Sequence, residues 1–239
     1  MESAAGTLYL IPCTLSEGMD RTIPPQTREK ALQLRHFFVE QERTARHFLK
    51  LLDPSIPLDE VRLYRMDQHH PADLEVARQI LKSGKDLGIL SEAGCPGIAD
   101  PGNTLVRLAH GLGARVIPLT GPSSILLALM ASGMNGQQFR FNGYLPVKSA
   151  ERIQAIRELE QQSTRQRLTQ IFIETPYRNN QLVADILQTC QPDTRLCIAA
   201  GITGPGEFIR TLPVRGWKTQ IPELHKVPAT FLLDAENSR

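Results

Sequence analysis

The stretch Ser91-Glu92-Ala93-Gly94-Cys95-Pro96-Gly97-Ile98-Ala99-Asp100-Pro101-Gly102 decides the fold class of this chain. It follows a short apolar run, Asp86–Leu90, and precedes an amphipathic segment, Pro101–Leu112. A buried strand, a glycine-rich loop and a helix in this order are typical of parallel α/β sheets, in which ligands bind beyond the carboxyl ends of the strands. A crossover turn that needs glycine and proline for its shape alone is an equally good interpretation of the loop.

The same alternation of strand and helix continues through the first half of the chain. The predicted strands are Thr7–Ile11, Val61–Met66, Asp86–Leu90 and Arg115–Leu119. Pro71–Ser83 has apolar residues at helical spacing, and Gly84 is placed to end that helix. This alternation predicts an α/β domain with a mostly parallel sheet over residues 1–120.

The pattern changes after Thr120–Gly121. Ser123–Ser132 is almost entirely apolar and predicts a buried helix. Strands are predicted at 138–144, 168–174, 195–202, 208–214 and 229–233, and helices at 149–162 and 179–190. Because no long helix separates the last two strands, we expect antiparallel pairing there and hence a mixed sheet in a second domain, 121–239. Two such domains predict a ligand cleft between them.

Composition excludes several classes of protein. The 239 residues include 27 Lys+Arg and 25 Asp+Glu, and 41% are hydrophobic, as in an ordinary folded chain. A net charge of +2 does not indicate a general nucleic-acid binder, and the basic stretch Arg28–Lys50 is better interpreted as a solvated face than as a phosphate track. No apolar run approaches the ~18 residues that span a bilayer, so we expect no membrane association.

Cysteine and histidine usage predicts a cytoplasmic protein without a metal. The four cysteines form no Cys-x-x-Cys pair, which fits a reducing compartment. His69-His70 lacks a second pair of ligands at suitable spacing. Pro12–Gly18, which follows the first strand, is neither Gly-x-Gly-x-x-Gly nor a P-loop, so the common nucleotide-binding motifs are excluded.

Two further loops are candidate binding segments. Thr120–Ser124 follows a predicted strand, and its serines either cap the next helix or donate to a ligand. Glu174–Arg178 follows another strand. Glu174 either binds a ligand or forms a surface ion pair with Arg178.

Five ordered segments resemble one known family. They are Gly6–Leu10, Ser91–Gly102, Thr120–Ser123, Gly143–Pro146 with Lys148-Ser149, and Glu174–Arg178. A further motif of that family is matched more weakly, and only Glu40, Arg43 and Arg46 of it remain in this chain. Their order and spacing are similar to those of the tetrapyrrole methylase superfamily, and specifically to its ribosomal RNA small subunit methyltransferase I branch.

The resemblance implies a homodimeric methyltransferase that binds S-adenosylmethionine between two α/β domains. The implied cofactor-binding residues are Pro12, Ala93, Gly94, Cys95, Ile98, Ser123, Ser124, Ala199, Ala200, Pro228, Ala229 and Thr230. A ribose hydroxyl is a poor nucleophile, so a general base would help, and the candidates are Glu92, Asp100 and Glu174. Asp100 has the alternative role of capping the helix that starts at Pro101.

The methyl acceptor is left open at this point. The resemblance favours ribosomal RNA, methylated on a ribose 2′-oxygen. Ala200–Phe208 stands where the branch carries Arg-Glu-Leu-Thr-Lys-x-His-Glu-Glu, and it lacks the Arg, Lys and His. A methyltransferase acting on a small molecule such as a tetrapyrrole, and a non-catalytic binding module with the same fold, are therefore the alternatives.

Overall fold

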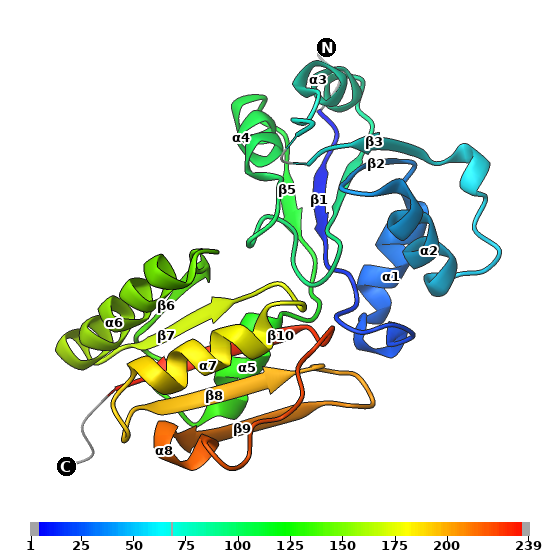
Figure 1. Cartoon of the computed structure of the whole chain (residues 1–239). Coiled ribbons are helices and arrows are strands. Elements are labelled where there is room, and N and C mark those ends of the chain that lie inside the picture. Colours follow the sequence, from blue (N-terminus) through cyan, green and yellow to red (C-terminus); the bar gives the residue numbers. More distant parts are fainter. Residues whose placement is uncertain (1–4, 68, 236–239) are drawn as a thin grey trace. The chain divides into compact units, whose positions relative to one another are not determined.

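The computed structural model describes residues 5–67 and 69–235 (Figure 1). They form two compact units, of which the first ends at Ser123 and the second begins at Ser124. Each unit contains a five-stranded sheet. The predicted α/β fold, with a parallel sheet in the first half and a mixed sheet in the second, is confirmed. Within the described ranges, no helix combines the length and the apolar character needed to cross a membrane.

The sheet of the first unit is parallel throughout, in the order β3-β2-β4-β1-β5. Its strands are β1 (Leu8–Ile11), β2 (His36–Val39), β3 (Arg62–Arg65), β4 (Leu87–Leu90) and β5 (Val116–Pro118). All four residues of β4 are buried, as the apolar run predicts. The prediction missed β2, because its short apolar run lies inside a basic stretch.

Helices cover both faces of this sheet. They are α1 (Pro25–Gln33), α2 (Glu42–Leu52), α3 (Leu74–Lys82) and α4 (Asn103–Gly111), with short 3-10 turns at Asp20–Thr22 and Leu58–Glu60. The helices α1 and α2 pack with Tyr9 and Ile11 on one face, and α3 and α4 pack with Leu8 and Ile89 on the other. Asp73 caps α3 by accepting hydrogen bonds from two backbone N–H groups.

Helix α4 begins two residues later than expected, so the predicted capping role of Asp100 is wrong. The helix starts at Asn103, and no side chain caps it. Gly102, the residue before the helix, has φ 136°, a conformation that favours glycine. Pro101 and Gly102 therefore extend the loop, and Asp100 is not a capping residue.

The basic stretch Arg28–Lys50 is used largely for local structure. Arg28 donates to the Leu52 carbonyl at 2.6 Å and pairs with Asp20. Lys50 donates to the Pro54 carbonyl at 2.7 Å. Charges bound in this way do not form one continuous track for phosphates.

The sheet of the second unit is mixed, in the order β6-β7-β10-β8-β9. Its strands are β6 (Phe139–Tyr144), β7 (Thr169–Ile173), β8 (Arg195–Ala200), β9 (Phe208–Pro213) and β10 (Ala229–Asp234). Only β6 and β7 pair in parallel. The expected antiparallel pairing occurs, but β10 lies between β7 and β8 and does not pair with β9.

The two faces of this sheet are covered unequally. The helices α6 (Ser149–Gln166), α7 (Asn179–Thr189) and α8 (Val214–Trp217) enclose a core that contains the fully buried Trp217. Figure 1 shows α7 in front of the sheet and α5 (Ser124–Ser132) behind it. Leu126 and Met130 of α5 are 52% and 79% exposed, whereas Ala128 and Leu129 are buried, so the predicted buried helix is buried on one side only. One side of α5 packs on β9 and β10, and its other side faces outward.

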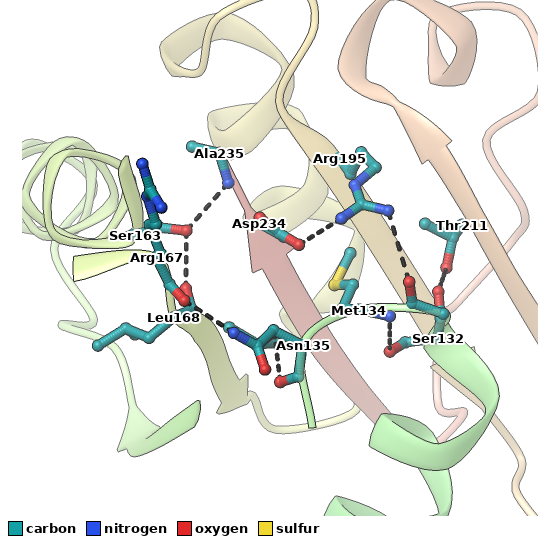
Figure 2. Close-up of polar contacts among 12 residues, drawn as sticks. Ser132, Met134, Asn135, Ser163, Arg167, Leu168, Arg195, Thr211, Asp234 and Ala235 are labelled. Atoms are coloured by element: carbon teal, nitrogen blue, oxygen red, sulfur yellow. Dashed lines mark hydrogen bonds and ion pairs between the residues drawn. The ribbon is translucent and has the colours of Figure 1, made fainter. Parts of the chain in front are cut away.

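Hydrogen bonds hold the segment between α5 and β6 against the end of the sheet where β8 begins and β10 ends. Asn135 donates to the Arg167 carbonyl at 2.9 Å, and the Ser163 hydroxyl joins Leu168 to Ala235 (Figure 2). Arg195 forms an ion pair with the buried Asp234. Polar groups at this edge are therefore largely occupied in holding the fold together.

Candidate functional site

The loops that follow β1 and β4 are joined by backbone hydrogen bonds. The Cys13 N–H donates to the Gly94 carbonyl at 2.9 Å, and the Gly94 N–H donates to the Cys13 carbonyl at 3.1 Å. The Ser91 hydroxyl donates to the same Gly94 carbonyl at 2.7 Å. Three of the residues predicted to contact a cofactor, Pro12, Gly94 and Cys95, thus lie in one group of loops.

The loop after β5 packs against the loop after β1. A Cβ atom added to Gly121 would lie only 2.4 Å from the Pro12 Cβ atom, so this close approach requires glycine. The Cys95 thiol donates to the Pro122 carbonyl at 3.5 Å. Ser123 and Ser124 follow directly in the chain, while Ala93 and Ile98 are exposed on the β4 loop. We call these three segments (12–16, 91–102 and 119–123) the strand-end loops.

The backbone of the β4 loop is unusual. Gly94 and Gly97 have φ values of 70° and 80°, and Ala99 has a φ of 64°. A non-glycine residue in the left-handed region costs about 1 kcal/mol. Such strain is common where a backbone is shaped around a ligand, so this loop is a good candidate for ligand binding.

Three carboxyl groups follow two neighbouring strands. Glu40 follows β2, whereas Glu92 and Asp100 lie in the loop after β4; we call these the strand-end carboxylates. After β2 the chain continues to β3 at one edge of the sheet, and after β4 it continues to β5 at the opposite edge. Such a switch point opens a crevice at the carboxyl ends of the strands, where open α/β sheets bind ligands.

Two of the strand-end carboxylates, Asp100 and Glu40, have raised pKa values. Burial and the charge of Glu92 raise the pKa of Asp100 to about 6. Burial, followed by the charges of Asp100 and Glu92, raises the pKa of Glu40 to about 7. The Glu40 Oε1 atom is buried and has no hydrogen-bond partner among the described residues. A cation bound here would relieve the repulsion and supply the missing partner.

Sequence reasoning missed Glu40 as a site residue. Its only signal was the weak family match, and the strand that places it was not predicted. The neighbouring thiols are poor nucleophiles, because burial raises the pKa of both Cys13 and Cys95. Across residues 5–67 and 69–235, no three His, Cys, Asp or Glu side chains are arranged to hold a metal ion.

Glu174 lies in the second unit and is 4% exposed. Its Oε1 atom accepts hydrogen bonds from the Thr175 N–H at 2.6 Å and from the Arg178 guanidinium at 2.5 Å. Its Oε2 atom and the Arg178 Nε atom are buried without partners in the described part of the chain. The ion pair that the sequence suggested therefore exists, but its carboxylate is buried rather than at the surface.

The remaining predicted cofactor residues lie where β8 ends and β10 begins in the second sheet. Ala200 pairs with Ala229, and Ala199 pairs with Thr230, across β8 and β10. The side chains of all four are buried, and the carbonyl of the exposed Pro228 accepts a hydrogen bond from the Gly201 N–H at 2.9 Å. Any contact of these residues with a ligand would thus involve mainly backbone atoms.

Two cavities lie within single units. One of about 60 Å³ lies next to Cys13, Phe48 and Glu92, and it has room for only a few water molecules. A larger one of about 820 Å³ lies at the edge of the second sheet where β8 begins. Two arginines that line it, Arg195 and Arg215, pair with acidic residues, and Glu160 accepts two hydrogen bonds, so these groups serve the fold.

Solved structures with the same fold include several methyltransferases. The chain superposes on the methyltransferase CobJ with a TM-score of 0.62, at 15% identity, over 98% of this chain and 96% of that one. The uroporphyrin-III-C-methyltransferase of Thermus thermophilus gives 0.53, at 16% identity, over 96% and 92% of the two chains. Identities this low show the fold alone, which is that of the tetrapyrrole methyltransferases.

Sequence relatives identify the family within that class. The ribosomal RNA small subunit methyltransferase I of Pseudomonas aeruginosa is 29% identical over 212 residues, which are 88% of this chain and 71% of the relative. The Xylella fastidiosa protein of the same name is 30% identical over 198 residues, 83% of this chain and 68% of the relative. No family model matches the chain. The chain belongs to the ribosomal RNA small subunit methyltransferase I family, as the five ordered segments predict, and it is a methyltransferase of that type.

Proposed function

We propose that this protein transfers the methyl group of S-adenosylmethionine to a ribose 2′-hydroxyl of ribosomal RNA. Family membership supports the reaction and the acceptor. The observation that carries the proposal is the group of strand-end loops, which hold Pro12, Gly94 and Cys95 together beside three carboxylates. Ala199, Ala200, Pro228, Ala229 and Thr230 of the second unit are included as further cofactor contacts on the strength of the family resemblance.

The residues present fit such a cofactor. S-adenosylmethionine carries an ammonium group and a sulfonium, and it supplies an electrophilic methyl group when bound. Glu40 Oε1 lacks a hydrogen-bond partner within the described ranges, and an ammonium group would supply one. The strained backbone of the β4 loop would offer peptide groups to the polar ends of such a ligand.

We assign the carboxylates different roles in the proposed methyl transfer. Asp100 has a pKa near the pH of a cell, so it can accept the ribose proton, and Glu92 raises the basicity of Asp100. The buried Glu174 holds the Arg178 guanidinium in place. We therefore assign Glu174 a positioning role in addition to its candidacy as a general base.

The assembly and the compartment follow the same resemblance. We propose a homodimer that works in the cytoplasm, and light scattering tests the dimer. All four cysteines are free thiols, and three of them are buried, which suits a reducing compartment.

Calorimetry and methyl transfer test the proposed function. Purified protein should bind S-adenosylmethionine and transfer tritiated methyl groups to 30S ribosomal subunits. Glu40→Gln and Asp100→Asn should weaken binding, transfer or both, whereas the matched surface change Glu75→Gln on α3 should alter neither. No binding at millimolar cofactor would refute the proposal. Transfer to a porphyrinoid alone would support the small-molecule alternative, and binding without any transfer would support the binding module.

A further inference from the structure

Two tyrosines are unusually exposed at one edge of the second sheet. Tyr144 ends β6 and is 56% exposed, and Tyr177 follows β7 and is 70% exposed. His225 is also exposed, and its ring lies 5.8 Å from the Tyr177 ring at an angle of 75°. We call these three residues the aromatic platform. The strand-end loops and the cofactor contacts do not account for it.

The backbone that carries Tyr177 and His225 is held rigidly. The Arg178 N–H donates to the Thr175 carbonyl at 2.9 Å, and the buried Glu174 binds both Thr175 and Arg178. The Lys226 N–H donates to the Pro176 carbonyl at 3.1 Å, which joins the His225 segment to the Tyr177 segment. An exposed ring on a fixed backbone loses little conformational entropy when it binds a partner.

Tyr144 ends the strand that pairs with β7, the strand that leads to Tyr177. Its Cα atom pairs with Ile173, directly before Glu174. Arg152 donates to the Val147 carbonyl at 2.7 Å and forms a buried ion pair with Asp185, which fixes the loop after β6. The hydrogen bond that the Arg178 guanidinium donates to Glu174 raises the pKa of Arg178 most, and the charge of the nearby Tyr144 adds to this effect, so Tyr144 and Arg178 are neighbours.

The register of the sheet relates this platform to the proposed cofactor contacts of the same unit. Tyr144 pairs with Ile173, Ile173 pairs with Thr230, and Thr230 pairs with Ala199. Neighbouring strands are about 4.8 Å apart, so the row from Ala199 to Tyr144 spans roughly 14 Å.

Exposed rings beside cations are the surface that unpaired nucleotides recognise. Bases that are not in a duplex stack on Tyr and His rings, and neighbouring cations contact the phosphates. Arg178 and Lys226 flank the rings and can supply those contacts. The acidic neighbours are engaged: Glu174 is buried under Arg178, and Glu223 accepts hydrogen bonds from Asn180 and the His225 backbone.

We propose that Tyr144, Tyr177 and His225 form a stacking surface for unpaired nucleotides of the RNA substrate, flanked by Arg178 and Lys226. The proposal rests on the proposed function, because it names how that enzyme recognises its acceptor. It further specifies the acceptor as a single-stranded segment, since the bases of a duplex are stacked on each other and cannot reach the rings.

Fluorescence anisotropy with a labelled 12-nucleotide single-stranded RNA tests the platform. Tyr177→Ala should weaken binding about 10-fold or more, which is the loss expected from one stacked base. Tyr177→Phe should bind like the unaltered protein, because stacking needs the ring and not the hydroxyl. Met130→Ala on α5 is the matched control, since it also truncates an exposed side chain of this unit. The same RNA in a duplex should bind more weakly than the single strand.

The outcomes separate this inference from the proposed function. If the unaltered protein methylates 30S subunits and Tyr177→Ala binds and methylates RNA equally well, only the platform is refuted. If the unaltered protein binds cofactor but no RNA, both the RNA acceptor and the platform are refuted. If Tyr177→Ala instead converts a dimer to a monomer in light scattering, the surface is a protein interface and the platform is refuted.

Discussion

Breaking the buried ion pair between Arg152 and Asp185 should strongly destabilise the second unit. Both side chains are 3% exposed, and the guanidinium lies 2.5 Å from the Asp185 Oδ2 atom. Asp185 also accepts a hydrogen bond from Gln181 at 3.0 Å. Asp185→Leu leaves the guanidinium buried without its counter-charge, which costs about 3–5 kcal/mol of unfolding free energy.

Urea unfolding measures this loss directly. At an m-value of about 2 kcal/mol per M, a loss of 3–5 kcal/mol lowers the urea midpoint by about 1.5–2.5 M. The chain contains a single tryptophan, Trp217, which is fully buried in the second unit and donates to the Leu196 carbonyl. Its fluorescence therefore reports the unfolding of that unit, while far-UV circular dichroism follows both units.

A double variant separates the ion pair from other effects of the substitution. Arg152→Met with Asp185→Leu removes both charges, so its loss should be smaller than the sum of the two single losses by about 1–3 kcal/mol. The reasoning is refuted if Asp185→Leu unfolds within about 0.5 M urea of the unaltered protein, which corresponds to a loss of roughly 1 kcal/mol or less. Losses that simply add in the double variant would also refute it.

Three further predictions concern the first unit. Gly121→Ala should cost about 1–3 kcal/mol and abolish cofactor binding in calorimetry, because its Cβ atom would lie 2.4 Å from Pro12; Gly111→Ala on α4, with open space around it, should do neither. Affinity for S-adenosylmethionine should rise about 10-fold or more from pH 5 to pH 8, because a cationic ligand binds the ionised forms of Asp100 and Glu40, whose pKa values are about 6 and about 7; a flat profile would contradict the assignment. Without cofactor, the raised pKa of Glu40 means that the native state holds its proton more tightly than the unfolded chain does, which stabilises the protein at low pH. This stabilisation is lost as the pH rises through about 7. Thermal unfolding should therefore show Glu40→Gln gaining stability relative to the unaltered protein between pH 5 and pH 8, and an equal difference at both values would exclude this effect.

Local sequence patterns predicted those strands, helices and loops whose apolar spacing or glycine content is visible within the segment itself. The apolar run of β4, the glycines of the loop after it and the alternation of strands with helices predicted a parallel α/β sheet. The family resemblance implied cofactor contacts for Pro12, Gly94 and Cys95, and that role stays a prediction. Hydrogen bonds and close contacts place these three residues in one group of loops. Strands, helices and glycine loops depend on neighbours in the chain, so a linear pattern shows them, whereas the grouping of Pro12 with Gly94 came from the family resemblance.

Only the tertiary structure revealed the features that depend on distant partners. The strand β10 lies between β7 and β8 because its neighbours are chosen by burial in the whole sheet, which no local pattern encodes. The pKa of Glu40 is raised because the fold buries its carboxyl group and places it beside carboxylates that are more than fifty positions away in the chain. Exposure of Tyr144 and Tyr177 likewise depends on which surfaces the helices leave uncovered, because a tyrosine in sequence is equally compatible with a core and with a surface.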